Sequence, residues 1–284
     1  MYAWLRTHPD VFRPAVKEPG YFAYAGGSAV PAAGPYDPEY VRHIVVERGP
    51  YTDLYEAAGP RLTGDVSPVY LLDENAAARI AAVRPDARII VLLRDPVERA
   101  FSQFLHHVRD SLETGGTFEE GLKMEPRRLR DGWSWGFGYA AHGHYAAQIE
   151  RYLAVFPRDQ ILFLDHGDLQ TAPGDCWRRI STHLGLEHRS LERNDRGNAT
   201  AGLTHVSRRP LLSHRLRHPG AVQTRLKSMV PPAMRSRLRQ ALEGGGRPVP
   251  VLRAETRQVL AGRYRGERSR IEAQTGLTLR HWFA

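Results

Sequence analysis

Residues 87–110 read ARIIVLLRDPVERAFSQFLHHVRD, and this stretch decides the fold. Residues 88–93 form a short apolar run rich in Ile and Val, which is typical of a strand buried on both faces. Asp95 then stands as an N-cap, with Pro96 at the first helical position and Glu98 at the third. Apolar residues follow at helical spacing: Val97, Ala100, Phe101, Phe104, Leu105 and Val108. We therefore predict a strand, a tight turn and a helix.

The same alternation of helix and strand recurs further along the chain. A helical stripe over 145–156 ends at Pro157, before the apolar run ILFL at 161–164. The next helix, within CWRRISTHLGL, ends at Gly185, a natural C′ residue. Helices that alternate with buried strands predict an α/β fold with a parallel sheet.

The C-terminal third has a different pattern. We predict helical segments around 206–242 and 251–275, followed by LTLRHWF, whose aromatic residues anchor this part of the chain. No strand is predicted there. The prediction for the whole is one α/β domain, residues 1–284, with a helical C-terminal third.

Composition limits the class of protein. With 284 residues, 42% of them hydrophobic, the chain can bury a sizeable core. It contains neither an apolar run of 18 residues nor the pattern of a signal peptide, so we expect a cytoplasmic protein. Cys176 is the single cysteine, so no internal disulfide can form, and we interpret it as a buried structural thiol.

The net charge of +9 comes from 40 Lys and Arg, of which three are Lys. This ratio is typical of a GC-rich, bacterial-type genome. Between 196 and 242 ten basic residues and no acidic residue occur, which favours an anionic partner. The same segment has no Phe, Tyr or Trp, so we do not expect nucleic-acid binding.

A candidate anion site follows the 88–93 strand. In an open parallel sheet, ligands bind at the carboxyl ends of the strands, where helix N-termini offer unpaired N–H groups. Arg94 leaves the strand at that edge, and Ser102 lies two turns into the helix. A guanidinium and a hydroxyl there suit a phosphate monoester. The alternative is that Arg94 pairs locally with Asp95 or Glu98 and that Ser102 has no special role.

Five ordered motifs resemble the sulfotransferases that use 3′-phosphoadenosine 5′-phosphosulfate (PAPS). The motifs span nearly the whole chain: HPDVFRPAVKEPGYF at 8–22, GDVSPVYLL at 64–72, LLRDPVERAFSQF at 92–104, HYAAQIERYLAVFPRDQILFLDHGDL at 144–169 and GRYRGERSRIEAQTGLTLRHW at 262–282. They resemble bacterial members related to the glycan-sulfating branch. The resemblance implies a P-loop-like fold, a central parallel sheet flanked by helices, and PAPS as the cosubstrate, with no metal.

The resemblance also implies where the nucleotide is held. Arg94 and Ser102 correspond to the residues that bind the 3′-phosphate of PAPS and of its product PAP. A loop that folds over the nucleotide corresponds to NDRGNATAGLTHVSRR at 194–209, with candidates Asn198, Arg208 and Arg209.

In this family a strand, a loop with a basic-x-Gly-Thr-Thr pattern and a helix hold the 5′-phosphosulfate, and that helix runs into a segment like MYAWLRTHPDV. We therefore expect that residue 1 lies within that helix and that the strand and loop precede it in a longer gene product. The alternative is a protein that has lost this loop, since no G-x-x-x-x-G-K-[ST] pattern occurs further on.

Glu18 corresponds to the general base proposed for the glycan-sulfating branch, and Lys17 is placed to offset charge on the bridging oxygen. On residue type alone, both are ordinary loop charges. Tyr70 and His144 are candidates for contact with the acceptor. Gly20 and Val66 stand where the glycan-sulfating animal enzymes often have His and Lys, which argues against a heparan-like acceptor.

We therefore predict sulfuryl transfer from PAPS to a hydroxyl group. The predicted acceptor is a small molecule such as a natural product, a glycan or a lipid. The alternative is a catalytically inactive protein of the same fold that binds nucleotides or polyanions. A P-loop kinase fits less well, because the P-loop Ser/Thr that binds Mg²⁺ is missing. His106, His107, His142 and His144 lack the neighbouring carboxylates of a metal site.

Overall fold

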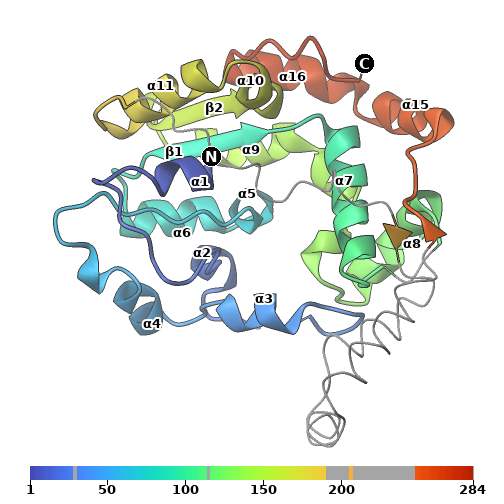
Figure 1. Ribbon diagram of the computed structural model, residues 1–284, viewed down its shortest axis with the longest axis horizontal. Coiled ribbons are helices and arrows are strands. Elements are labelled where there is room, and N and C mark those ends of the chain that lie inside the picture. Colours follow the sequence, from blue (N-terminus) through green and yellow to red (C-terminus); the bar gives the residue numbers. More distant parts are fainter. Residues whose placement is uncertain (28–30, 114–115, 190–204, 207–246, 284) are drawn as a thin grey trace, which may run out of the picture.

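The computed structural model describes residues 1–27, 31–113, 116–189, 205–206 and 247–283. Figure 1 shows the arrangement of its helices and strands. The strands are β1 (Ile89–Leu93), β2 (Ile161–Asp165), β3 (His205–Val206) and β4 (Arg247–Pro248). The helices are α1 (Tyr2–Leu5), α2 (Tyr21–Tyr24), α3 (Pro38–His43), α4 (Arg48–Asp53), α5 (Val69–Leu72), α6 (Ala76–Val83), α7 (Pro96–Arg109), α8 (Phe118–Arg130), α9 (Tyr145–Leu153), α10 (His166–Thr171), α11 (Pro173–Leu184), α15 (Ala254–Arg263) and α16 (Arg265–Thr275).

The strands β1 and β2 pair in parallel, from Ile89 opposite Ile161 to Leu93 opposite Asp165. Both predicted strands and their parallel arrangement are therefore confirmed. A parallel pair needs a long crossover, and α7, α8 and α9 lie between the two strands in the sequence. The carboxyl ends of the two strands consequently lie at the same edge, where α7 and α10 begin.

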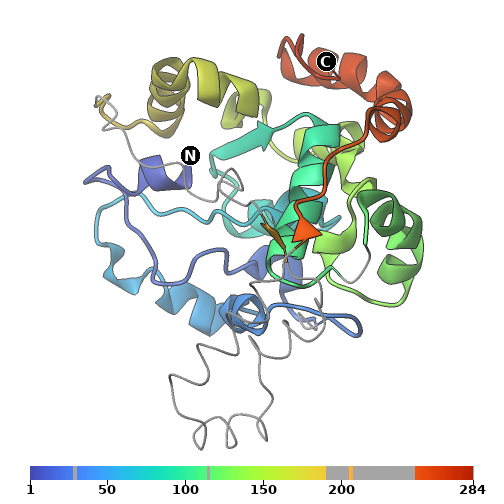
Figure 2. The same cartoon turned by 45° about the vertical axis from the view of Figure 1, so that its right-hand side comes forward.

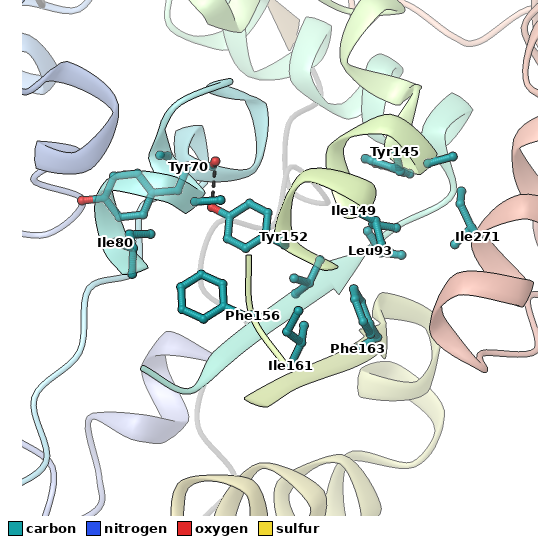
Figure 3. Close-up of a cluster of buried hydrophobic side chains, with 14 of the residues drawn as sticks. Tyr70, Ile80, Leu93, Tyr145, Ile149, Tyr152, Phe156, Ile161, Phe163 and Ile271 are labelled. Atoms are coloured by element: carbon teal, nitrogen blue, oxygen red, sulfur yellow. Dashed lines mark hydrogen bonds between the residues drawn. The ribbon is translucent and has the colours of Figure 1, made fainter. Parts of the chain in front are cut away.

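One face of this sheet packs against α9 and α16. Val91 and Leu93 of β1 lie in the same buried cluster as Ile149 of α9 and Ile271 of α16. Figure 3 shows Ile149 and Tyr152 over the strands, with the Tyr152 hydroxyl donating to the Tyr70 carbonyl at 2.9 Å. The helical stripe predicted over 145–156 is thus the inner face of α9.

The other face of the sheet packs against α11 and α1. Leu164 of β2 lies in a cluster with Trp177 and Ile180 of α11, and Trp4 of α1 packs against it. Figures 1 and 2 both show α11 near β2. Because successive residues of a strand point to opposite faces, a strand covered on both sides has the continuous apolar sequence seen in β1 and β2.

The helix α7 starts as predicted. The Asp95 carboxylate accepts hydrogen bonds from the backbone N–H groups of Val97 at 2.8 Å and Glu98 at 3.1 Å, and Pro96 occupies the first turn. The buried positions of α7 follow the predicted spacing: Val97, Ala100, Phe104 and Val108. The cap fixes the direction of α7 at the end of β1, and therefore places Arg94 and Ser102.

The described part of the C-terminal third differs from the prediction in one respect. Its helices α15 and α16 lie within the predicted segment 251–275. However, β3 and β4 form a short antiparallel pair where we predicted no strand. Two-residue strands have no periodicity, and their pairing depends on contact between segments about 40 residues apart. The predicted helix around 206–242 lies almost entirely outside the described residues.

Cys176 is buried on α11, as predicted. Among the residues that the structure describes, no helix is both long enough and apolar enough to cross a membrane.

Candidate functional site

A cavity of about 1690 Å³ extends along β1 and α7 and reaches the segments around α2 and α3. These elements surround the centre of Figure 1. Five of the residues predicted from the sequence line this cavity: Lys17, Glu18, Tyr70, Arg94 and Ser102. They come from positions up to 85 residues apart, so the fold brings together what the sequence separates.

Arg94 and Ser102 line the cavity at the end of β1. The recorded ion pair of Arg94, with Glu98, has an N–O distance of 4.0 Å, whereas Arg257 contacts the same carboxylate more closely. The Asp95 carboxylate accepts hydrogen bonds from the backbone N–H groups at the start of α7. Within the described ranges the Ser102 hydroxyl has no recorded hydrogen-bond partner. The Arg94–Glu98 pair of the alternative is thus present, at a long N–O distance, and Arg94 and Ser102 both line the cavity.

Lys17 and Glu18 form the second feature. The Lys17 Nζ lies 2.7 Å from the Glu18 Oε1, and 23% of the Glu18 side chain is exposed. Glu18 has a φ of 57°, in the left-handed region that residues with a Cβ rarely adopt. Such backbone strain persists only where surrounding contacts hold it, and it is concentrated at functional sites.

The contacts that hold this loop come from the segment GDVSP. The Ser67 hydroxyl accepts a hydrogen bond from the Gly20 backbone N–H at 3.0 Å and donates to the Asp65 carboxylate at 2.6 Å. Tyr51 and Tyr70 also donate to Asp65. Burial raises the pKa of Asp65, and its hydrogen bonds oppose that shift. The segment GDVSP, which resembles a family motif, thus holds the loop that contains Glu18.

An aromatic wall, which the sequence did not reveal, continues from this loop. It consists of Tyr24, Tyr40 and Trp135, all of which line the cavity. The Trp135 indole N–H donates to the Tyr40 hydroxyl at 3.3 Å, and Tyr40 is hydrogen-bonded to Tyr24. Burial raises the pKa of both tyrosines, so both hydroxyls remain protonated. No spacing rule connects three aromatic residues that lie on three separate short helical segments.

The two residues predicted to contact the acceptor, Tyr70 and His144, lie in different places. Tyr70 lines the cavity, but it is only 8% exposed and its hydroxyl donates a hydrogen bond to Asp65. The Nδ1 of His144 lies 3.4 Å from Glu267, and its ring packs edge-on against Tyr264 of the C-terminal helices. His144 thus contacts α16 and its neighbour rather than the cavity.

Asn198, Arg208 and Arg209 lie outside the described residues. Within the described ranges no group of three or more His, Cys, Asp or Glu could hold a metal ion. Burial lowers the pKa of His106 and brings that of His107 to about 3, so both imidazoles are neutral at pH 7. Arg99 and Gln103 of α7, which were not predicted from the sequence, also line the cavity beside Ser102.

Comparison with known proteins places these features in a family. Residues 67–209 match the family described as "Sulfotransferase domain". Human heparan sulfate glucosamine 3-O-sulfotransferase 3B1 is 30% identical over 201 residues, which cover 70% of this chain and 46% of that protein. Human bifunctional heparan sulfate N-deacetylase/N-sulfotransferase 3 is 32% identical over 119 residues, 41% of this chain and 14% of that protein.

A solved structure matches nearly the whole chain. The crystal structure of a sulfotransferase from Alicyclobacillus acidocaldarius superposes with a TM-score of 0.75 at 25% identity, covering 99% of this chain and 92% of that one. The chain spans about half the length of the curated heparan sulfate 3-O-sulfotransferases that it matches. The matched domain includes β1, α7 and β2, which position the cavity, and the chain belongs to the sulfotransferase domain family.

Proposed function

We propose that this protein transfers a sulfuryl group from PAPS to a hydroxyl group of an acceptor. The observation that carries the proposal is the cavity that has Arg94 and Ser102 on one part of its wall and Lys17 and Glu18 on another. Binding of a nucleotide phosphate and removal of a hydroxyl proton are two of the tasks that this transfer requires.

Arg94 and Ser102 hold the 3′-phosphate in this proposal. A guanidinium whose recorded carboxylate partner is 4.0 Å away, next to a hydroxyl with no recorded partner in the described ranges, fits a phosphate monoester. The N-terminus of α7, a helix of 14 residues, adds a favourable dipole for an anion at this end of the cavity.

Glu18 is the general base in this proposal, and Lys17 stabilises negative charge. PAPS, when bound, supplies the sulfuryl group and a phosphate leaving group. The Glu18 carboxylate accepts the proton of the acceptor hydroxyl, so that the hydroxyl oxygen becomes a better nucleophile. The Lys17 ammonium, 2.7 Å from Glu18, offsets the negative charge that develops on the bridging oxygen of PAPS as sulfur leaves it.

The acceptor is a hydroxyl compound of the small-molecule, glycan or lipid class. The curated relatives are by name enzymes of heparan sulfate, which is a polyanion. Gly20 and Val66 occupy positions where the glycan-sulfating animal enzymes often have basic residues, so transfer to a heparan-like chain is not part of the proposal.

The nucleotide site is tested by calorimetric titration of the full chain with PAP. Because a charge-assisted contact contributes about 1.5–3 kcal/mol, we expect Arg94→Ala to weaken PAP binding by about tenfold or more, and Ser102→Ala by less. Arg178→Ala, which removes an exposed guanidinium paired with Asp175 on α11, is the control and should leave the affinity unchanged. Equal affinities for PAP in all four proteins would refute the site.

Turnover is tested with ³⁵S-labelled PAPS and a panel of 2-naphthol, octyl glucoside and chondroitin. We expect Glu18→Gln to lower kcat about 10²–10⁴-fold for the accepted compound, with PAP affinity unchanged. Tight PAP binding without transfer to any panel compound would instead favour the catalytically inactive alternative. Unchanged turnover in Glu18→Gln would remove Glu18 from the mechanism.

A further inference from the structure

We infer that the acceptor end of the cavity binds an uncharged or cationic aromatic hydroxyl compound, such as a phenol, in preference to an anionic one. The inference rests on the proposed function and names the class of its acceptor. It follows from the aromatic wall, from the charges beside that wall and from the backbone at Gly20.

The aromatic wall begins directly beside Glu18. Gly20 has a φ of +66°, and a Cβ at this position would lie 2.9 Å from two ring carbons of Tyr24. The Tyr24 ring therefore packs on the backbone two residues from Glu18. The hydrogen bonds among Tyr24, Tyr40 and Trp135 extend this surface into the cavity. Glu18 is close enough to Tyr40 to contribute to the rise in the pKa of that hydroxyl.

Rings arranged in this way bind flat apolar groups. Offset-stacked or edge-to-face contacts between aromatic rings add about 0.5–1.5 kcal/mol per pair beyond the area that they bury. The centroid of the Trp135 indole lies 6.2 Å from that of the neutral His142 imidazole, which extends the aromatic surface. An aromatic ring placed against this wall can present its hydroxyl to Glu18, since the wall and Glu18 share Gly20 as a neighbour.

The charges on this part of the wall oppose an anionic acceptor. Around this part of the wall, the described charged side chains that line the cavity are the cations Lys17 and Arg99 and the carboxylates Glu18, Asp37, Asp65 and Asp110. Lys17 is already bonded to Glu18. Asp37 caps α3 through the Glu39 N–H, and Asp110 contacts Arg109. His106 is neutral because burial lowers its pKa. A sulfonate or carboxylate on the acceptor would therefore meet more carboxylates than cations.

The surroundings of Gly20 disfavour the histidine that the glycan-sulfating animal enzymes often have at this position. A histidine at this position would need a left-handed backbone and would collide with the Tyr24 ring. The aromatic ring thus occupies the space that a basic side chain needs. In the reaction the acceptor oxygen bonds to sulfur as the bond from sulfur to the phosphate oxygen of PAPS breaks, and the hydroxyl proton passes to Glu18.

The experiment measures binding to the full chain in the presence and absence of saturating PAP, by quenching of tryptophan fluorescence and by calorimetry. The matched probes are 2-naphthol, its anionic analogue 6-hydroxynaphthalene-2-sulfonate, the cationic phenol tyramine and the polyanion chondroitin. We expect 2-naphthol and tyramine to bind about tenfold or more tightly than the naphtholsulfonate. Tighter binding of the naphtholsulfonate or of chondroitin would overturn the inference.

Two variants test whether the aromatic wall and the charge beside it determine which acceptor binds. Trp135→Ala should weaken 2-naphthol binding by about tenfold. Asp37→Asn should strengthen naphtholsulfonate binding by about threefold and leave 2-naphthol unchanged, because only charge is removed. Asp53→Asn, on the exposed end of α4, is the control for charge and should change neither.

Unchanged affinities in Trp135→Ala and Asp37→Asn would refute the assignment. PAP binding is recorded in the same titrations. A failure of the nucleotide site would therefore appear as lost PAP binding with 2-naphthol binding retained, and would be distinguished from a failure of this inference.

Discussion

His107 belongs to a hydrogen-bond chain that runs from the cavity to a buried ion pair. Arg128 and Glu113, 4% and 0% exposed, pair at 2.6 Å, and the Tyr139 hydroxyl donates to Glu113. The hydroxyl must then accept from the His107 Nδ1–H, which leaves Nε2 to accept from the amide of Gln103. The neutral form of His107 is required, in agreement with its low pKa. The direction of every hydrogen bond is set by the carboxylate at the far end.

The lowered pKa of His107 makes the free energy of unfolding depend on pH. Burial lowers the pKa of His107 in the folded protein to about 3, from an ordinary value of 6.5. Between these values the unfolded chain binds a proton that the native protein does not, so the free energy of unfolding falls as pH falls from 6.5 toward 3. We expect His107→Gln to make this fall shallower by at most about 1.4 kcal/mol per pH unit.

Urea unfolding at pH 7, 6, 5 and 4 measures the slope. His188→Gln, at an exposed position, is the control and should keep the wild-type slope. Identical slopes in the wild type and in His107→Gln would contradict the prediction. The substitution also alters the contacts with Tyr139 and Gln103, which changes the unfolding free energy at every pH. The change of that free energy with pH is therefore compared, and not its absolute value.

At the scale of elements, α7 connects the sequence most directly to the site. Its cap, its first turn and its apolar stripe all follow from residues within a few positions of one another. The Asp95 carboxylate also accepts from the backbone N–H of Phe283, at 2.5 Å, so one side chain holds both α7 and the C-terminal segment. This second contact could not be predicted, since it joins residues 188 positions apart.

Asp95→Ala should therefore destabilise the protein more than loss of an ordinary cap. Thr117→Ala removes the capping box of α8 and should cost about 1 kcal/mol of unfolding free energy. For Asp95→Ala we expect about 2 kcal/mol or more, because the Phe283 N–H also loses its partner. Urea unfolding of the two variants makes the comparison, and equal losses would show that the contact with Phe283 contributes nothing.

At the scale of the whole molecule, the C-terminal segment joins the ends of both strands. The Trp282 side chain is 2% exposed and lies in the cluster beneath β1 and β2. Its indole N–H donates to Asp165 at the end of β2, and His281 pairs with the same carboxylate at 2.7 Å. Phe283 contacts the cap of α7. The aromatic anchor predicted from LTLRHWF is thus confirmed for Trp282.

We expect Trp282→Ala to lower the free energy of unfolding by about 3–5 kcal/mol, because the indole leaves a cavity between α9 and the sheet. Val251→Ala, at a side chain that is 81% exposed, is the control and should stay within about 0.5 kcal/mol of wild type. Urea unfolding at pH 7 distinguishes the two. A small loss in Trp282→Ala would show that the segment merely covers the strands.

The fold was predictable where the determinants are local. β1, β2, α7, α9 and α11 each have a spacing of apolar residues, a cap or a breaker that depends on neighbours in the sequence. The short pair β3–β4 has no such pattern, and its pairing is a contact between distant segments. His144 was likewise predicted from its sequence motif to contact the acceptor, whereas in the structure it contacts Tyr264 and Glu267, which are more than 100 residues away in the sequence.

The sequence by itself determined that the chain is α/β, that Arg94 follows a strand and Ser102 lies in the next helix, and that Glu18 lies in a stretch that resembles a sulfotransferase motif. These properties depend on periodicity and on order along the chain. Only the tertiary structure decided that Tyr24, Tyr40 and Trp135 form one wall beside Glu18. The physical reason is that these side chains come from separate helical segments, whose meeting depends on how the core packs and not on any local spacing.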